Sequence, residues 1–151
     1  MPTDEITAKA QILIRRPRNE VFNAFMDPAV MSKFWLKRKD KGLREGDKIT
    51  WFVGDASDAF EIEVRVMSIK QPSQIKIEWG QDGQFTTVTW TLDEQNPDVT
   101  RLVIEERGFI GTRDEVVSQA LDSTGGFNQV IVALKALLEH NSTINVVADR
   151  V

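Results

Sequence analysis

The sequence contains no cysteine, no tyrosine and a single histidine, His140. Without cysteine the chain can form no disulfide, thiolate nucleophile or cysteine metal site, and one histidine leaves little acid–base chemistry near neutral pH. No apolar run approaches the roughly 20 residues that a membrane-spanning helix needs, and residues 1–5 lack the basic start and apolar stretch of a signal peptide. We therefore expect a cytoplasmic protein, and these absences weigh against an enzyme.

The composition is that of an ordinary globular domain. The chain has 151 residues, of which 41% are apolar and 28% charged, and its net charge is −4. This length suffices for one continuous core, and the negative balance argues against nucleic acid or an anionic membrane as a partner. We expect one domain over residues 1–151, with a compact core over about residues 7–140 and a C-terminal tail without clear periodicity over residues 141–151.

Hydrophobic periodicity in the first part of the chain predicts a strand and two short helices. Residues 7–15 alternate apolar and polar side chains, which is typical of a half-buried strand. Pro17 suits the start of a helix, and Asp27 followed by Pro28 is a second cap-and-start signal. The second helix would extend to about Trp35.

Residues 48–107 predict five further strands joined by short turns, and so an antiparallel sheet. The apolar phase slips by one residue at Met67 and Ile69, as a β-bulge that bends its strand would cause. Asp82-Gly83 is typical of a tight hairpin turn. Together with residues 7–15, these segments predict a curved sheet of six strands.

A long helix ends the predicted fold. Thr112 and Glu115 have the spacing of a capping box, in which each side chain bonds the backbone amide of the other residue. Apolar residues then recur at helical spacing from Val117 through Leu121 to Leu138, a length of roughly 40 Å for the whole helix. Because only this helix is long enough to cover the inner face of the sheet, the predicted fold class is α+β, a curved antiparallel sheet wrapped on a long C-terminal helix.

Residues 36–47 form a polar and basic segment with two open interpretations. The segment could bind an anion or an acidic partner, or it could be a solvated loop, which is what such charge runs usually are. Its cationic residues are Lys37, Arg38, Lys39, Lys41 and Arg44.

The four tryptophans, Trp35, Trp51, Trp79 and Trp90, are the most informative side chains. They could surround a cavity for an apolar guest, or they could simply fill the core. Phe52 competes with Trp51 for the inner face of its strand. A buried indole N–H needs an acceptor, so at least one of these rings could mark a polar spot in the interior.

Glu106 continues the inward phase of Leu102 and Ile104 on the last strand. If its side chain points inward, the buried carboxylate is costly unless it is paired or hydrogen-bonded, and it is a candidate polar anchor for a ligand. If the strand has instead reached the rim of the sheet, Glu106 is solvated or paired with Arg107.

Gly125 and Gly126 lie inside the predicted long helix, where each costs about 1 kcal/mol relative to alanine. They could form a hinge that lets the helix open over the interior. Alternatively, they could permit close backbone packing of the helix against the sheet, or mark a kink.

Local motifs along nearly the whole chain carry a family resemblance. They are residues 16–25 (RPRNEVFNAF), 27–35, Gly46-Asp47 before Trp51, Pro72 before residues 77–79, and residues 88–92, 100–104 and 125–135. In this order they resemble the START/SRPBCC helix-grip superfamily, nearest to the branch of the activator of heat-shock-protein ATPase. The resemblance implies a deep pocket between sheet and helix, in which many members hold lipids, polyketides or other apolar molecules. Some relatives are cyclases or resistance proteins, and others are cochaperone-like.

Three positions depart from the pattern of this superfamily. Gly80 follows Trp79, Phe127 stands where relatives often have tryptophan, and the strand end reads Glu-Glu-Arg at residues 105–107, where histidine or glutamine is common. A shared fold does not fix function, so the resemblance leaves the function open.

The leading hypothesis is non-catalytic binding of a small hydrophobic molecule, lipid- or polyketide-like, in a cavity between the sheet and the C-terminal helix, without a cofactor or a metal. One alternative is a chaperone-activator-like protein-interaction module that uses residues 37–44, and another is a cyclase- or hydrolase-like enzyme that uses Glu106. A protein partner or a homodimer is compatible with either. The candidate ligand-binding residues are Trp35, Trp51, Ile62, Val64, Ile77, Trp79, Trp90, Ile104, Glu106, Phe127 and Ile131.

Overall fold

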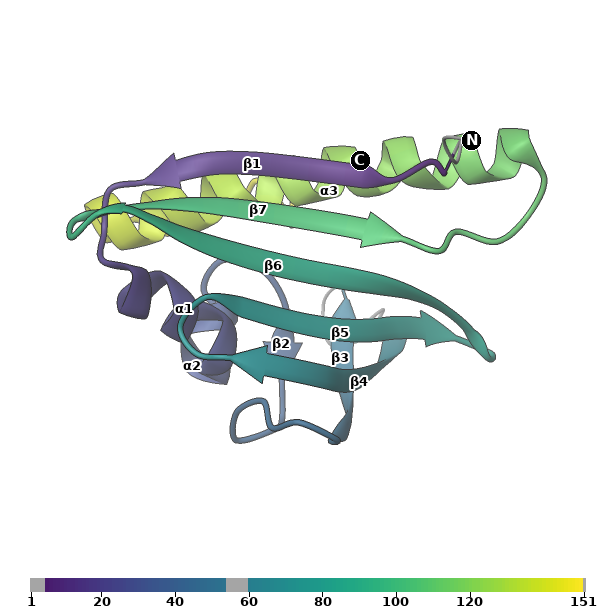
Figure 1. Ribbon diagram of the computed structural model, residues 1–151, viewed down its shortest axis with the longest axis horizontal. Helices are drawn as coiled ribbons and strands as arrows, with labels where there is room; N and C mark the ends of the chain where they lie inside the picture. Colours follow the sequence, from purple (N-terminus) through teal and green to yellow (C-terminus); the bar gives the residue numbers. More distant parts are fainter. Residues whose placement is uncertain (1–4, 54–59, 151) are drawn as a thin grey trace.

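The computed structural model describes residues 5–53 and 60–150, and within them one antiparallel sheet of seven strands has the order β1-β7-β6-β5-β4-β3-β2. The sheet curls so that β2 and β3 lie behind β4 and β5 in Figure 1. The predicted α+β helix-grip class is confirmed, with one strand more than the six predicted. The strands are β1 (Ala8–Ile14), β2 (Lys37–Arg38), β3 (Lys48–Val53), β4 (Phe60–Lys70), β5 (Gln74–Gln81), β6 (Gln84–Asn96) and β7 (Val99–Arg107).

The additional strand, β2, lies within the basic segment. It pairs with β3 through Lys37 opposite Phe52 and Arg38 opposite Trp51. A strand of two residues is too short to show a period of two, so the sequence pattern could not reveal it.

Two short helices, α1 (Arg18–Met26) and α2 (Pro28–Met31), connect β1 to β2 at one end of the sheet (Figure 1). The Asp27 carboxylate accepts a hydrogen bond from the amide of Ala29 at 2.9 Å. Pro28 then occupies the first turn of α2, where its missing N–H costs nothing. The start signal at Asp27 and Pro28 is therefore confirmed, and Pro17 immediately precedes α1 as its N-cap. α2 ends at Met31, however, earlier than the predicted end near Trp35.

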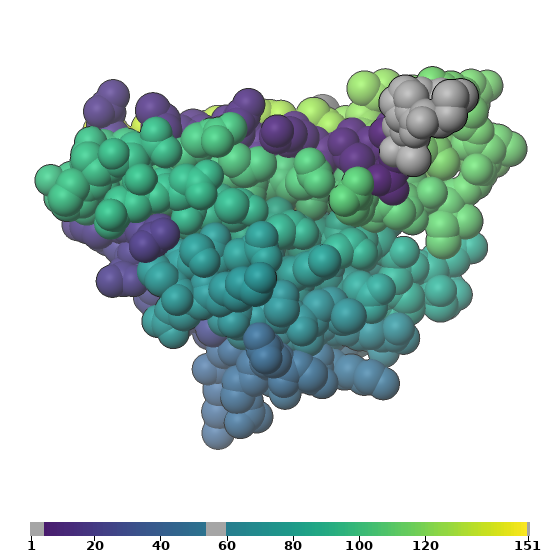
Figure 2. Space-filling view, in the orientation of Figure 1, coloured from purple at the N-terminus to yellow at the C-terminus, as the bar shows by residue number. Residues whose placement is uncertain are grey.

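The long strands follow the predicted alternation closely. The register between β4 and β5 shifts between Val66 and Ser68, which confirms the β-bulge expected at Met67. Asp82 and Gly83 both have positive φ, 54° and 78°, as a tight hairpin turn requires. The apolar residues predicted to point inward from β6 and β7 are fully buried; they are Val88, Trp90, Leu92, Leu102 and Ile104. The side chains between these inward positions point to the opposite, outer face of the sheet. Figure 2 shows this outer face, with bands of colour that follow the order of the strands.

The long helix α3 (Arg113–His140) runs along β1 and β7, behind the sheet in Figure 1. Its capping box is present: the Thr112 hydroxyl accepts from the Glu115 amide, and the Glu115 carboxylate accepts from the Thr112 amide, both at 3.3 Å. In the described part of the chain, no helix combines the length and the apolar character needed to span a membrane.

The C-terminal half of α3 is fastened to β1 by a small polar network. The Lys135 ammonium donates to the Leu13 carbonyl and to the Glu139 carboxylate, both at 2.6 Å, and that carboxylate also accepts from the Arg15 amide at 2.9 Å. Burial alone would raise the pKa of Glu139, but the Arg15 amide and Lys135 outweigh it and leave the pKa below its ordinary value. This end of the helix is therefore fixed to the edge of the sheet.

The N-terminal half of α3 packs much less closely. The helical spacing placed Leu121 on the face of α3 that covers the sheet, which we call the seam, but Leu121 is 68% exposed, so that assignment is wrong. Val116 and Val117 are half-buried, and the continuous buried cluster of the core takes in α3 from Phe127 onward. The predicted seam therefore holds only over the C-terminal half.

The C-terminal segment does not trail from α3, contrary to the lack of pattern in its sequence. Val146 and Val147 pack against the core, and the Arg150 guanidinium donates to the backbone oxygen of Asp122 at 3.0 Å and to its carboxylate at 2.7 Å. A Cβ atom at Gly126 would lie 2.6 Å from this guanidinium. The glycine pair thus permits close packing, but against the guanidinium of Arg150 rather than against the sheet, as one interpretation had expected.

Candidate functional site

The eleven candidate ligand-binding residues all lie in or against the core beneath α3. Three of them are half-buried, namely Trp35, Ile62 and Trp79. The other eight are buried: Trp51, Val64, Ile77, Trp90, Ile104, Glu106, Phe127 and Ile131. The structure therefore brings the candidates to one region, although their contact with a ligand stays a prediction.

Five of these rings form an aromatic cluster, defined here as Trp35, Trp51, Trp79, Trp90 and Phe127. Trp35, which follows α2, lies at its centre, with ring-centroid distances of 5.8 Å to Trp51, 5.8 Å to Trp79, 6.0 Å to Trp90 and 6.3 Å to Phe127. Phe127 of α3 stacks on Trp79 of β5 with an interplanar angle of 14°. The cluster therefore joins the helix to the sheet through ring contacts.

The competition between Trp51 and Phe52 is resolved by the sheet register. Trp51 is fully buried, whereas Phe52 points to the other face and carries the Lys39 ammonium 4.7 Å above its ring. On the inner side, the Arg38 guanidinium lies 5.3 Å from the ring centroid of Trp51. Trp51 therefore belongs to the interior.

Glu106 points inward and is only 3% exposed, so the expectation of a rim position is wrong. Its Oε2 atom accepts a hydrogen bond from the Trp79 indole Nε1 at 2.8 Å and another from the Thr86 hydroxyl. Arg107, the alternative partner, pairs instead with Glu5. Thr86 was missed by the sequence analysis, although it shares the inward phase of Val88 on β6.

Three buried polar atoms in this region have no hydrogen-bond partner among the described residues. They are Nε1 of Trp51, Nε1 of Trp90 and Oε1 of Glu106. Native proteins leave few such atoms unsatisfied, because each one costs about 1 to 3 kcal/mol. Chemically, the site offers two N–H donors and one carboxylate acceptor within aromatic walls.

Two surface hollows lie elsewhere on the described residues. One of about 420 Å³ is lined by the start of α3 at Asp114, Glu115, Ser118 and Gln119. Another, of about 220 Å³, lies between the start of β1 and the start of α3 and is lined by Glu5, Ile6, Phe109, Arg113 and Val116. Neither hollow is lined by a tryptophan or by any other candidate ligand-binding residue.

The basic segment is not a uniformly solvated loop, because Arg38 turns into the protein. Its guanidinium donates to the Phe25 carbonyl at 2.6 Å and to the Met26 carbonyl at 3.3 Å, and it forms an ion pair with Asp40. Burial pushes the pKa of Asp40 upward, but the hydrogen bond and charge of Arg38, with the Gly42 amide, hold the net pKa below its ordinary value.

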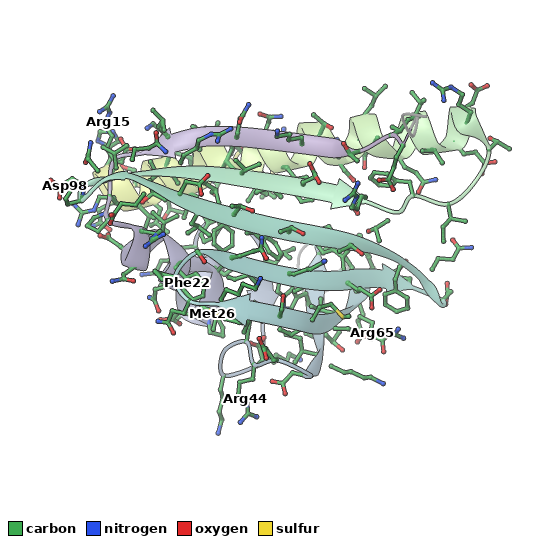
Figure 3. The ribbon with its side chains drawn as sticks, in the orientation of Figure 1. Arg15, Phe22, Met26, Arg44, Arg65 and Asp98 are labelled. Carbon is green, nitrogen blue, oxygen red and sulfur yellow. The ribbon has the colours of Figure 1, made fainter. Side chains whose placement is uncertain are left out.

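The other cations of this segment remain at the surface. Figure 3 shows Arg44 projecting from the connection between β2 and β3, and Lys37, Lys39 and Lys41 are likewise exposed. Four of the five cations that the sequence analysis named are thus available to solvent or to a partner.

Comparison with known proteins gives one family and a consistent fold. The family model described as "Activator of Hsp90 ATPase homolog 1-like protein" matches residues 15–139. A search of curated proteins finds no match.

Three solved structures illustrate the likeness of fold. A Staphylococcus saprophyticus protein is 27% identical with a TM-score of 0.75, and the alignment covers 91% of this chain and 95% of that one. DynU16, a protein of the dynemicin biosynthetic locus, is 19% identical with a TM-score of 0.74, and the alignment covers 94% of this chain and 49% of that one. An Hsp90 activator from Plasmodium falciparum is 16% identical with a TM-score of 0.69, with 89% and 96% covered.

Proposed function

The chain belongs to the family of Activator of Hsp90 ATPase homolog 1-like proteins, and on that basis we propose that it binds a small hydrophobic molecule at the aromatic cluster without transforming it. The ligand would lie between the sheet and α3, in contact with Trp35, Trp79 and Phe127. The likeness of fold to DynU16, a protein of a biosynthetic locus, is in line with a small-molecule ligand.

The observation that carries this proposal is the set of unpartnered polar atoms inside the aromatic cluster. Unsatisfied buried polar atoms destabilise the fold, and three of them are Trp51 Nε1, Trp90 Nε1 and Glu106 Oε1. If these residues served packing alone, apolar side chains would be expected at their positions. A mostly apolar ligand with a few polar groups would satisfy these polar atoms while its frame contacts the rings. Pockets for small molecules commonly combine apolar walls with a few convergent polar groups.

The aromatic cluster is packed less closely on the side of Trp35, Trp79 and the first half of α3, which favours entry of a ligand there. Trp35 and Trp79 are half-buried, and the first half of α3 contacts the core much less than the half fastened to β1. Binding there requires that the first half of α3 move outward and that Trp35 rotate, so that the ligand finds room next to Phe127. Burying about 200 Å² of apolar ligand surface would then contribute about 5 kcal/mol before the entropic costs of binding.

Intrinsic tryptophan fluorescence tests the proposal, because four indoles surround the site. We expect a saturable change with a stoichiometry of one when 2-naphthol is added, measured in parallel by equilibrium dialysis. The variant Phe127→Leu should weaken binding several-fold, whereas Leu121→Ala, on the exposed face of the same helix, should bind as the unmodified protein does. The absence of any saturable binding by dialysis would refute the proposal.

A second candidate function is activation of an Hsp90 ATPase, which the family description and the exposed cations of the basic segment favour. Such a protein would raise the ATPase rate of an Hsp90 chaperone, and its cations would contact acidic residues of that partner. Reversing the charge at Lys37, Lys39 and Lys41 should then abolish the stimulation. If the unmodified protein leaves the ATPase rate unchanged, this candidate fails.

A further inference from the structure

The two oxygens of the Glu106 carboxylate have very different surroundings. Oε2 accepts from the Trp79 indole at 2.8 Å and from the Thr86 hydroxyl, whereas Oε1 is buried and accepts from no described residue. A carboxylate oxygen is an acceptor with room for about two hydrogen bonds. One half of this carboxylate is therefore satisfied by the protein and the other half is not.

The two bonds to Oε2 also fix the direction of Oε1. An indole N–H can only donate, and Trp79 is held on β5 by its stack against Phe127. Thr86 lies on β6, directly opposite Trp79 in the sheet register. Because Glu106 itself lies on β7, three neighbouring strands determine the position of the carboxylate, and it cannot turn Oε1 toward water without losing both bonds.

No cation compensates the free oxygen. Among residues 5–53 and 60–150, no ion pair includes Glu106, and the adjacent Arg107 is engaged with Glu5. A buried acceptor of this kind favours a partner that brings its own hydrogen, and it penalises a molecule of the same shape that presents only an oxygen lone pair.

Resting on the proposed function, we infer that the ligand carries a hydroxyl or N–H group that donates to Oε1 of Glu106, and that this atom selects such molecules over analogues without a donor. Glu106, which is hydrogen-bonded to Trp79 of the aromatic cluster, is thus a specificity-determining residue. The ligand class is an apolar molecule with a hydrogen-bond donor at one end, and the rings contact the rest of its frame.

The test compares 2-naphthol with 2-methoxynaphthalene, which share an aromatic frame and differ in that a methyl group replaces the donor hydrogen. The variant Glu106→Gln separates the loss of the donor from the added size of the methyl group. Equilibrium dialysis of the unmodified protein should show 2-naphthol binding about 10-fold to 100-fold more tightly. In Glu106→Gln the amide oxygen can still accept from Trp79 and Thr86, but an NH₂ group then replaces the free acceptor. The preference for 2-naphthol should therefore disappear or reverse in this variant.

The outcomes separate this inference from the proposed function. Equal affinity of the unmodified protein for both probes overturns the inference while leaving ligand binding intact, and no binding of either probe overturns both. Tighter binding of 2-methoxynaphthalene also overturns the inference, because a free acceptor cannot favour the probe that lacks a donor hydrogen. The comparison on the unmodified protein stands even if Glu106→Gln does not fold, and near-ultraviolet circular dichroism shows whether the variant keeps its packed tryptophans.

Discussion

Replacing Arg38 by methionine is expected to destabilise the fold by about 3 to 5 kcal/mol, although Arg38 belongs to the most basic stretch of the chain. The guanidinium donates to the carbonyls of Phe25 and Met26 at the end of α1 and pairs with Asp40, whose side chain is only 8% exposed. It also covers the face of Trp51. Methionine keeps much of the apolar contact, so the expected loss comes from the carbonyls and the carboxylate left without their donor.

Urea unfolding followed by tryptophan fluorescence at pH 7 measures this loss. The matched control is Lys41→Met, which removes an exposed cation of the same segment and should change the free energy of unfolding by no more than about 0.5 kcal/mol. The double variant Arg38→Met with Asp40→Asn should lose less than the sum of the two single variants, because the ion pair is broken only once. Equal losses for Arg38→Met and Lys41→Met would refute the buried network.

The same network has a signature in pH dependence. The pKa of Asp40 is below its ordinary value of 3.8 in the folded state, so its ionised form stabilises the fold above the pKa of the unfolded chain. This contribution is lost as the pH falls through the folded pKa. The difference in stability between the unmodified protein and Asp40→Asn should therefore shrink between about pH 5 and about pH 2. A difference that stays constant over this range would contradict the role of the ion pair.

Three further changes test other parts of the fold. Glu139→Gln should lower the free energy of unfolding by about 1 kcal/mol at pH 7, because it weakens the bonds between α3 and β1. The pKa of Glu139 is lowered in the folded state, so the ionised carboxylate loses its stabilising effect as the pH falls. The difference in the free energy of urea unfolding between this variant and the unmodified protein should therefore shrink at lower pH. Gly126→Ala should displace Arg150, seen as faster hydrogen exchange over residues 142–150, whereas Gly125→Ala, whose Cβ would lie 3.3 Å from the same guanidinium, should have a smaller effect. Thr112→Ala should cost about 1 kcal/mol in urea unfolding by removing the capping box, and a loss near zero would mean that the first turn of α3 frays already.

The sequence predicted the sheet and the long helix because both depend on periodicity over many residues. A strand with one buried face must alternate, so β4, β6 and β7 reveal their inner residues and even the bulge next to Met67. The helical spacing of α3 was equally clear, but it could not show how far the helix stays in contact with the sheet. Leu121 repeats the pattern of the seam and still faces solvent.

The residues that the sequence misjudged are those whose partners lie far away along the chain. Arg38 looked solvated within a run of cations, and its acceptors are carbonyls 12 and 13 residues earlier. For Glu106 the sequence left an inward and a rim position open, and the donors that decide between them are 27 and 20 residues away on two other strands. Hydropathy cannot register such contacts, because a charged side chain has the same hydropathy whether or not the fold supplies its partners.

These two buried charges also differ in a way that bears on function. The guanidinium of Arg38 donates hydrogen bonds to two carbonyls and a carboxylate, as expected of a group that holds α1 against β2. Glu106 lies just as deep, yet one of its oxygens and the indole N–H groups of Trp51 and Trp90 have no partner among the described residues. The same fold therefore supplies hydrogen-bond partners to the buried guanidinium of Arg38 but leaves one oxygen of the buried Glu106 carboxylate without a partner among the described residues. This difference in hydrogen bonding is the physical reason to expect that Oε1 of Glu106 accepts a hydrogen bond from a ligand.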